Sequence, residues 1–189
     1  MEIFTILFIA LGLSLDSFAV SVTNGLILPE IKFWNAVKVA ISMAIFQGFL
    51  PIIGWFIGSK ISTYFVDFDH WIAFGILGAL GIKMILESLK DDEIPKDYNP
   101  LEFKMIISMS IATSIDALIV GLGLGFFETP IIYTCFIIGF ITFLAAMIGM
   151  LIGKKTGAKF GRKMETIGGI ILILIGFKIL IEHLIAHYY

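Results

Sequence analysis

The chain alternates long apolar runs with short polar connections. Six of the apolar runs reach the length that a membrane-spanning helix requires, which is about 20 residues at a rise of about 1.5 Å per residue. They cover Ile3–Leu28, Val39–Gly58, Trp71–Leu89, Met105–Phe127, Pro130–Gly153 and Ile167–Ala186. The longest polar connection, residues 90–104, is too short to form a soluble domain. The pattern predicts an all-α membrane protein with six transmembrane helices.

The composition agrees with this reading. The mean hydropathy is +1.02, with 59% hydrophobic and only 15% charged residues, as expected for a chain whose solvent is the lipid bilayer. The net charge of −2 gives no basis for nucleic-acid binding. Because the chain has a single cysteine, Cys135, the sequence also argues against a membrane thiol–disulfide carrier.

The basic residues predict an orientation. Connections on one side of the membrane carry ten lysines and arginines, whereas those on the other side carry Lys60 alone. Cytoplasmic loops are enriched in such residues, so we expect a multi-pass protein of the cytoplasmic (inner) membrane with both termini outside the cytoplasm. The ten are Lys32, Lys38, Lys90, Lys96, Lys104, Lys154, Lys155, Lys159, Arg162 and Lys163.

Three segments of the first half recur in order in the second half. The matches are LSLDSFAV at 13–20 with TSIDALIV at 113–120, GWFIG at 54–58 with GMLIG at 149–153, and GIKMILESL at 81–89 with GFKILIEHL at 176–184. Ordered matches of this kind indicate an internal duplication.

The duplication predicts two repeats of three helices, residues 1–89 and 105–189, joined by a cytoplasmic linker at 90–104. Because each repeat holds an odd number of helices, the second enters the membrane in the opposite sense. Such an inverted-topology repeat is common in secondary transporters, whose substrate sites lie near the midplane of the bilayer.

Asp16 and Asp116 are equivalent in the two repeats, and each lies near the middle of an apolar run. An ionised carboxylate there costs about 3 kcal/mol on insertion scales. Two such groups at close range in a low dielectric do not both ionise readily, and either a divalent cation or protons can neutralise them. We therefore expect a two-aspartate site that exchanges a metal for protons. The alternative is a structural pair that accepts hydrogen bonds from neighbouring helices.

Neutral oxygen donors accompany the two aspartates. Serines and threonines flank both, although hydroxyls in membrane helices also bond to their own backbone. Pro51 frees the backbone carbonyl group of Gln47. Gln47 either packs against a neighbouring helix or supplies oxygen ligands. Thr142 holds the corresponding position in the second repeat. The candidate metal ligands are Asp16, Asp116, Gln47, Thr142, Ser14, Thr113 and Ser114.

These donors select a class of metal. Carboxylate and neutral oxygen suit Mg²⁺, Ca²⁺ or Mn²⁺, whereas Zn²⁺ and Cu⁺ prefer histidine or cysteine. The residues alone thus predict a hard divalent cation, carried as a substrate rather than held as a cofactor.

Two further repeated features have simpler explanations. The pairs Lys83–Glu87 and Lys178–Glu182 have i,i+4 spacing near helix ends, so we expect ion pairs that extend to the membrane interface; a gating or relay role is the alternative. The small-residue pairs Gly54/Gly58 and Gly149/Gly153 predict close helix packing.

Two other functions compete with metal transport. An amino-acid transporter requires a fixed positive group or a helix N-terminus near the midplane to bind the carboxylate, and the intramembrane lysines lie toward helix ends in the sequence. An intramembrane aspartyl protease also needs two aspartates that share a proton. Such enzymes carry a GxGD-type sequence, whereas Asp116 follows Ser-Ile and Asp16 follows Ser-Leu.

The chain resembles the MntP-type manganese efflux pumps. The likeness lies in SLDSFAVS, FQGFLPIIGW, DHWIAFGILGALGIKMI, ATSIDALIVGLG and GFKILIEH, which follow one another over essentially the whole chain. The resemblance implies a six-helix inner-membrane exporter of Mn²⁺ in which Asp16 and Asp116 are essential. It also implies that Gln47 and Thr142 occupy polar positions of the family. Manganese, as distinct from another hard cation, is implied by the resemblance alone.

Overall fold

The computed structural model describes residues 3–28, 30–62, 69–90, 99–127, 129–156 and 158–188. Within these residues no strand occurs, and each of the helices is long and apolar enough to cross a membrane. The prediction of six transmembrane helices is confirmed. The helices are α1 (Ile3–Ile27), α2 (Phe33–Ser62), α3 (Asp69–Ser88), α4 (Phe103–Leu124), α5 (Ile131–Thr156) and α6 (Ala158–Tyr188).

Two helices extend far beyond the apolar runs that predicted them. Helix α2 begins at Phe33 rather than Val39, and α6 begins at Ala158 rather than Ile167. A helix of 30 residues such as α2 is about 45 Å long, which exceeds the roughly 30 Å of a hydrocarbon core. The extra turns carry basic residues such as Lys38 and Lys159. They were not predicted, because an apolar run marks only the part of a helix that contacts lipid.

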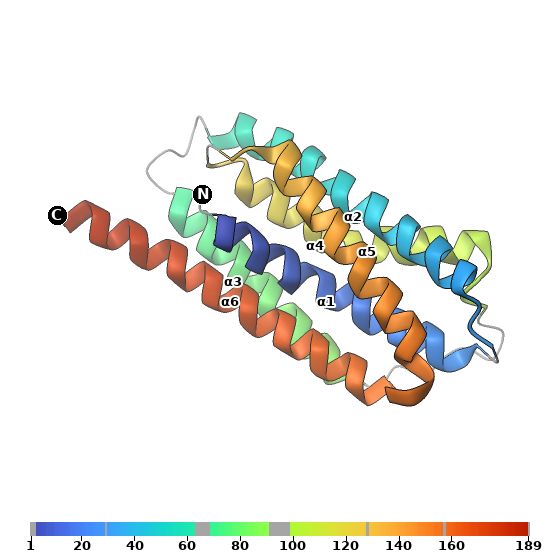
Figure 1. Cartoon of the computed structure of the whole chain (residues 1–189). Helices are drawn as coiled ribbons and strands as arrows, with labels where there is room; N and C mark the ends of the chain where they lie inside the picture. The colour runs from blue at the N-terminus through green and yellow to red at the C-terminus, as the bar shows by residue number, and fades with distance from the viewer. Residues whose placement is uncertain are drawn as a thin grey trace.

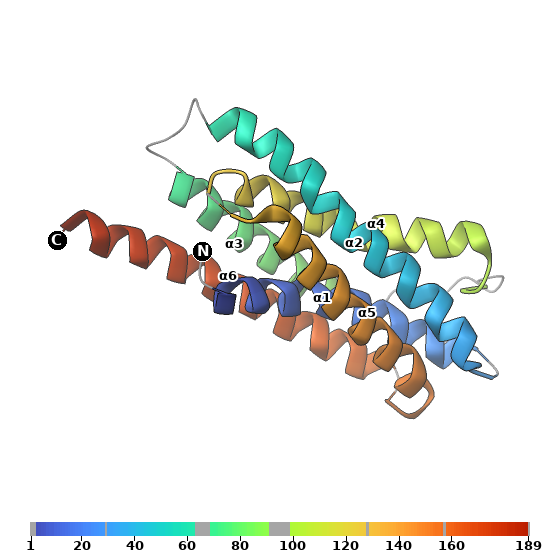
Figure 2. The same ribbon diagram turned by 45° about the horizontal axis from the view of Figure 1, so that its top comes forward.

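The helices form one elongated bundle (Figure 1). The two ends of the chain lie at one end of the bundle, and α1 leads into α2 at the other, as the turned view of Figure 2 also shows. The most extensive packing joins α1 to α5, α2 to α4 and α3 to α6, whereas α3 touches α4 only slightly. The predicted linker at 90–104 lies largely outside the described residues.

Glycines permit the closest helix contacts. A Cβ atom on Gly54 would overlap the carbonyl oxygen of Leu118 in α4, and one on Gly153 would overlap that of Val22 in α1. Backbones approach this closely only where both side chains leave room. The packing role predicted for the two glycine pairs is confirmed.

Two apolar clusters fill the interior, and polar residues separate them along four helices. Gln47 of α2 lies between Met43 of one cluster and Ile52 of the other, and Thr142 of α5 lies between Ala146 and Ile138. Along α1 and α4, too, polar residues lie between members of the two clusters. Together these residues form a polar layer across the middle of the bundle. Its buried members are Ser14, Ser17, Gln47, Thr113, Ser114, Asp116 and Thr142.

Candidate metal-binding site

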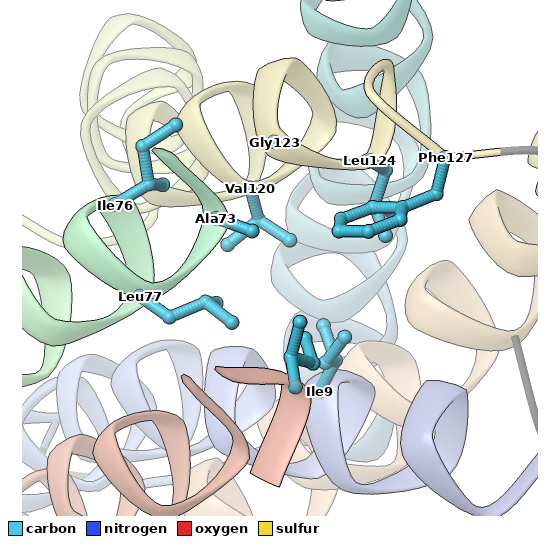
Figure 3. Close-up of a pocket in the computed structure, with 9 residues that line it drawn as sticks. Ile9, Ala73, Ile76, Leu77, Val120, Gly123, Leu124 and Phe127 are labelled. Carbon is cyan, nitrogen blue, oxygen red and sulfur yellow. The ribbon is translucent and has the colours of Figure 1, made fainter. Parts of the chain in front are cut away.

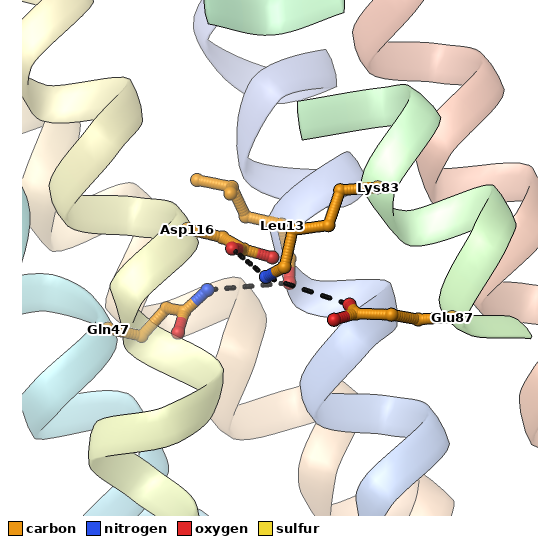
Figure 4. A network of polar contacts seen from close by, with 5 residues as sticks. All are labelled: Leu13, Gln47, Lys83, Glu87 and Asp116. Carbon is orange, nitrogen blue, oxygen red and sulfur yellow. Dashed lines mark hydrogen bonds and ion pairs between the residues drawn. The ribbon is translucent and has the colours of Figure 1, made fainter. Parts of the chain in front are cut away.

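Asp116 is the most deeply buried charged group of the polar layer. The residue is 3% exposed, and the ammonium group of Lys83 in α3 donates a hydrogen bond of 2.7 Å to its Oδ1 atom. Figure 4 shows this amine between the carboxylates of Asp116 and Glu87. A buried carboxylate is stable only when a cation or hydrogen-bond donors compensate it, and here Lys83 does so.

This contact corrects two sequence-based expectations about Lys83. The i,i+4 pair with Glu87 exists, at 3.6 Å, but the amine also reaches Asp116 in another helix instead of simply extending to the interface. A positive group therefore does lie beside an intramembrane aspartate, contrary to the argument made above against an amino-acid site. The equivalent Lys178 is 3.4 Å from Glu182 and donates to the hydroxyl of Thr5 at 3.0 Å.

Asp16 lies in the same electrostatic environment. Among the described residues, the groups that act on its carboxylate are those of Asp116, Glu165, Glu87 and Lys83. Three of these four are carboxylates, so with Asp16 the group holds four potential negative charges and one positive charge. Repulsion of this kind favours the binding of a cation or of protons.

Gln47 links three helices beside Asp116. The amide nitrogen of Gln47 donates to the backbone oxygen of Leu13 at 3.4 Å (Figure 4). The hydroxyl of Ser114 donates to the side-chain carbonyl oxygen of Gln47 at 2.9 Å. Gln47 and Ser114 are fully buried. These bonds connect α2 to α4 and α1, so Gln47 holds the polar layer together whether or not it binds metal.

The other candidate ligands are placed differently. The hydroxyl of Ser14 donates to the backbone oxygen of Leu11 at 2.8 Å, and the hydroxyl of Thr113 donates to the backbone oxygen of Met109 at 3.0 Å. Both therefore bond within their own helices, the alternative noted from the sequence. The buried hydroxyl of Thr142 has no hydrogen-bond partner among the described residues, and the same holds for Ser17.

Sequence reasoning missed Glu165. It lies in the first part of α6 and acts electrostatically on Asp16. The repeat gave no signal for it, because the equivalent position in the first half is His70. The only signal available was an acidic residue just before the last apolar run.

A small cavity of about 10 Å³ lies among apolar side chains near this site. Val120, one helical turn beyond Asp116, helps to line it (Figure 3). Its lining is apolar, so a water molecule there has no side-chain hydrogen-bond partner. The described residues that line it are Ile9, Ala73, Ile76, Leu77, Val120, Gly123, Leu124, Phe127 and Ile179.

The hydrogen bond between Ser114 and Gln47 is expected to contribute measurably to stability. We expect a double-mutant cycle of Ser114→Ala and Gln47→Leu to give a coupling energy of about 0.6 to 1.7 kcal/mol, the range of interhelical bonds in membranes. Thermal unfolding in detergent measures it. The matched control pairs Gln47→Leu with Thr23→Ala, because among the described residues the Thr23 hydroxyl donates within α1, to the backbone oxygen of Ala19. Equal coupling in the two cycles would contradict the assignment.

The fold and the site define a multi-pass membrane protein whose charged groups converge within the bundle, as in a membrane ion transporter. A family model described as "Putative manganese efflux pump" matches residues 30–180. The chain belongs to this MntP family, whose members are transporters and not enzymes. No solved structure matches the chain.

Relatives named "Putative manganese efflux pump MntP" match nearly the whole chain. That of Rippkaea orientalis is 46% identical over 187 residues, covering 99% of this chain and 100% of the relative. That of Gloeothece citriformis is 46% identical and covers 97% of each chain. That of Photorhabdus laumondii is 41% identical and covers 97% of this chain and 96% of the relative. This similarity over the full length argues against an intramembrane aspartyl protease.

Proposed function

We propose that the chain exports Mn²⁺ across the cytoplasmic membrane and binds the ion between Asp16 and Asp116. The observation that carries the proposal is the buried carboxylate of Asp116, which acts electrostatically on Asp16 within the apolar bundle. The full-length similarity to manganese efflux pumps supports the choice of metal and the direction of transport.

The charge balance supports exchange of the metal for protons. Asp16, Asp116, Glu87 and Glu165 together carry up to four negative charges against the single charge of Lys83. Mn²⁺ reduces this excess when it binds, and protons on the carboxylates reduce it after the metal has left. Coupling to the proton gradient follows from this exchange and is part of the proposal.

Neutral oxygen atoms complete the proposed ligand set. The hydroxyl of Thr142 is fully buried and without a partner among the described residues, so binding a metal would satisfy it. The side-chain oxygen of Gln47 is a second donor, although Ser114 already bonds to it. Ser14, Thr113 and Ser114 are kept as outer candidates, because their hydroxyls donate to other protein groups.

We also propose that residues 1–89 and 105–189 are inverted repeats. Two pairs of contacts support this arrangement: Gly54 packs on Leu118, and the equivalent Gly149 packs on Phe18. The basic residues support an orientation with both termini outside the cytoplasm. Labelling single cysteines placed at positions 60 and 159 from opposite faces of the membrane checks this orientation.

Everted membrane vesicles test the function directly. We expect vesicles containing the protein to accumulate Mn²⁺, which a dye inside the vesicles reports. Mn²⁺ uptake should slow when the proton gradient is collapsed. Vesicles without the protein are the control. Excess Mg²⁺ should compete weakly, because Mg²⁺ gives up its water reluctantly. Accumulation of Mg²⁺ or Ca²⁺ but not Mn²⁺ would reassign the substrate, and rapid uptake of another solute with no metal uptake would refute the function.

A further inference from the structure

The ammonium group of Lys83 lies between two carboxylates from different helices. It is 2.7 Å from Oδ1 of Asp116 in α4 and 3.6 Å from Oε2 of Glu87, one turn further along its own helix (Figure 4). The Asp116 side chain is 4% exposed, whereas those of Lys83 and Glu87 are 44% and 42% exposed. One partner is therefore buried, and the other is accessible at the outer surface of the bundle.

The Lys83 side chain is half-exposed and lies between two helices that pack only weakly on each other. Helix α3 packs mainly on α6 and touches α4 only slightly, so the contact between Lys83 and Asp116 bridges two helices that are otherwise weakly joined. Since lysine is a compact charge on a flexible stem, the amine can transfer from Asp116 to Glu87 by side-chain rotation. No rearrangement of the backbone is required.

The equivalent lysine of the second repeat is placed differently. Lys178 is 3.4 Å from Glu182 and donates to Thr5, a residue eleven positions before Asp16 in α1. The lysine of the α3 motif therefore bonds to an intramembrane aspartate, whereas the lysine of the α6 motif bonds to a threonine. The difference gives the chain an internal control.

We propose that Lys83 is a tethered counter-cation, which occupies Asp116 when no metal is bound and moves to Glu87 when a divalent cation takes its place. This inference rests on the proposed function, because it requires Asp116 to be a metal ligand. Metal and amine compete for one carboxylate oxygen. Each therefore lowers the affinity of Asp116 for the other.

The exchange has a consequence for transport. With Lys83 on Asp116, the metal-free site keeps its deepest carboxylate compensated, so the protein can return to its starting conformation without a metal in the site. Release of the metal is also assisted, because the amine is available to replace it. We therefore expect Lys83 to weaken metal binding and to speed turnover.

Binding of Mn²⁺ to the purified full-length protein tests the proposal. The electron paramagnetic resonance signal of free Mn²⁺ reports the Kd in lipid nanodiscs. We expect Lys83→Met to bind Mn²⁺ about tenfold more tightly, because a charge-assisted bond to Asp116 no longer competes, and to transport it more slowly in vesicles. Glu87→Gln should weaken binding about threefold, since the amine loses its alternative partner.

Lys178→Met is the matched control and should leave the Kd unchanged. A purely structural role for Lys83 is distinguished by thermal unfolding with and without Mn²⁺. If the amine and the metal compete, Mn²⁺ should raise the Tm of Lys83→Met more than that of the wild type. Should Lys83→Met fold poorly, Lys83→Gln serves in the same measurements.

The outcomes separate this inference from the proposed function. Unchanged or weaker Mn²⁺ binding by a folded Lys83→Met, with binding lost in Asp116→Asn, overturns the tethered cation and retains the site. Wild-type binding by Asp116→Asn overturns the site itself. Tighter binding by both Lys83→Met and Lys178→Met would indicate a general effect of charge and would also overturn the proposal.

Discussion

Asp116→Asn is expected to abolish Mn²⁺ export and to reduce Mn²⁺ affinity by about a hundredfold. The substitution keeps the shape of the side chain but removes its charge, and removing one partner of a buried charge pair typically costs about 2 to 5 kcal/mol of binding free energy. Lys83 then has Glu87 as its carboxylate partner. Vesicle uptake and the Kd for Mn²⁺ measure the two effects.

The matched control is Glu102→Gln, which makes the same chemical change on the same helix. Glu102 is exposed at the start of α4, and its side chain makes no capping hydrogen bond. We expect it to transport Mn²⁺ like the wild type. If Asp116→Asn retained uptake within about twofold of Glu102→Gln, well below the effect of a lost buried charge, the carboxylate of Asp116 would not be a ligand.

Asp16→Asn should have an effect of the same kind, since the two carboxylates act on each other.

The two aspartates were predictable because the repeat marks them twice, at positions where a charge is costly in lipid. The six predicted helices were also found, but the starts of α2 and α6 were not predicted, since hydropathy reports only the segment in lipid and α6 begins nine residues earlier than its apolar run.

The role of Lys83 was not predictable from spacing alone. The i,i+4 rule identifies Glu87 as a partner on the same helix, but the bond to Asp116 depends on how α3 lies against α4. Glu165 was missed for a related reason, because its electrostatic effect on Asp16 depends on where α6 lies in the bundle and not on the repeat. Contacts between side chains of different helices can be identified only once the fold is known.

Gly54→Ala is expected to destabilise the bundle strongly, although alanine is normally the better helix former. A Cβ atom at position 54 would overlap the backbone oxygen of Leu118 and approach the backbone nitrogen of Leu122 at 2.7 Å. Backbone atoms, unlike side chains, cannot rotate away, so α2 and α4 must separate. Overpacking of this kind costs about 1 to 3 kcal/mol, and sometimes more.

Gly75→Ala in α3 is the matched control, because a Cβ atom there meets nothing within 4 Å among the described residues outside its own stretch of helix. Glycine in a helix is destabilising by about 0.5 to 1 kcal/mol relative to alanine, so this variant should unfold at a slightly higher temperature than the wild type. Thermal unfolding in detergent should therefore move the two variants in opposite directions. Equal shifts would mean that α2 and α4 are not in close contact at Gly54. Since Leu118 lies two residues beyond Asp116 on the same helix, separation of α2 from α4 should also reduce Mn²⁺ transport in Gly54→Ala, with no such loss in Gly75→Ala.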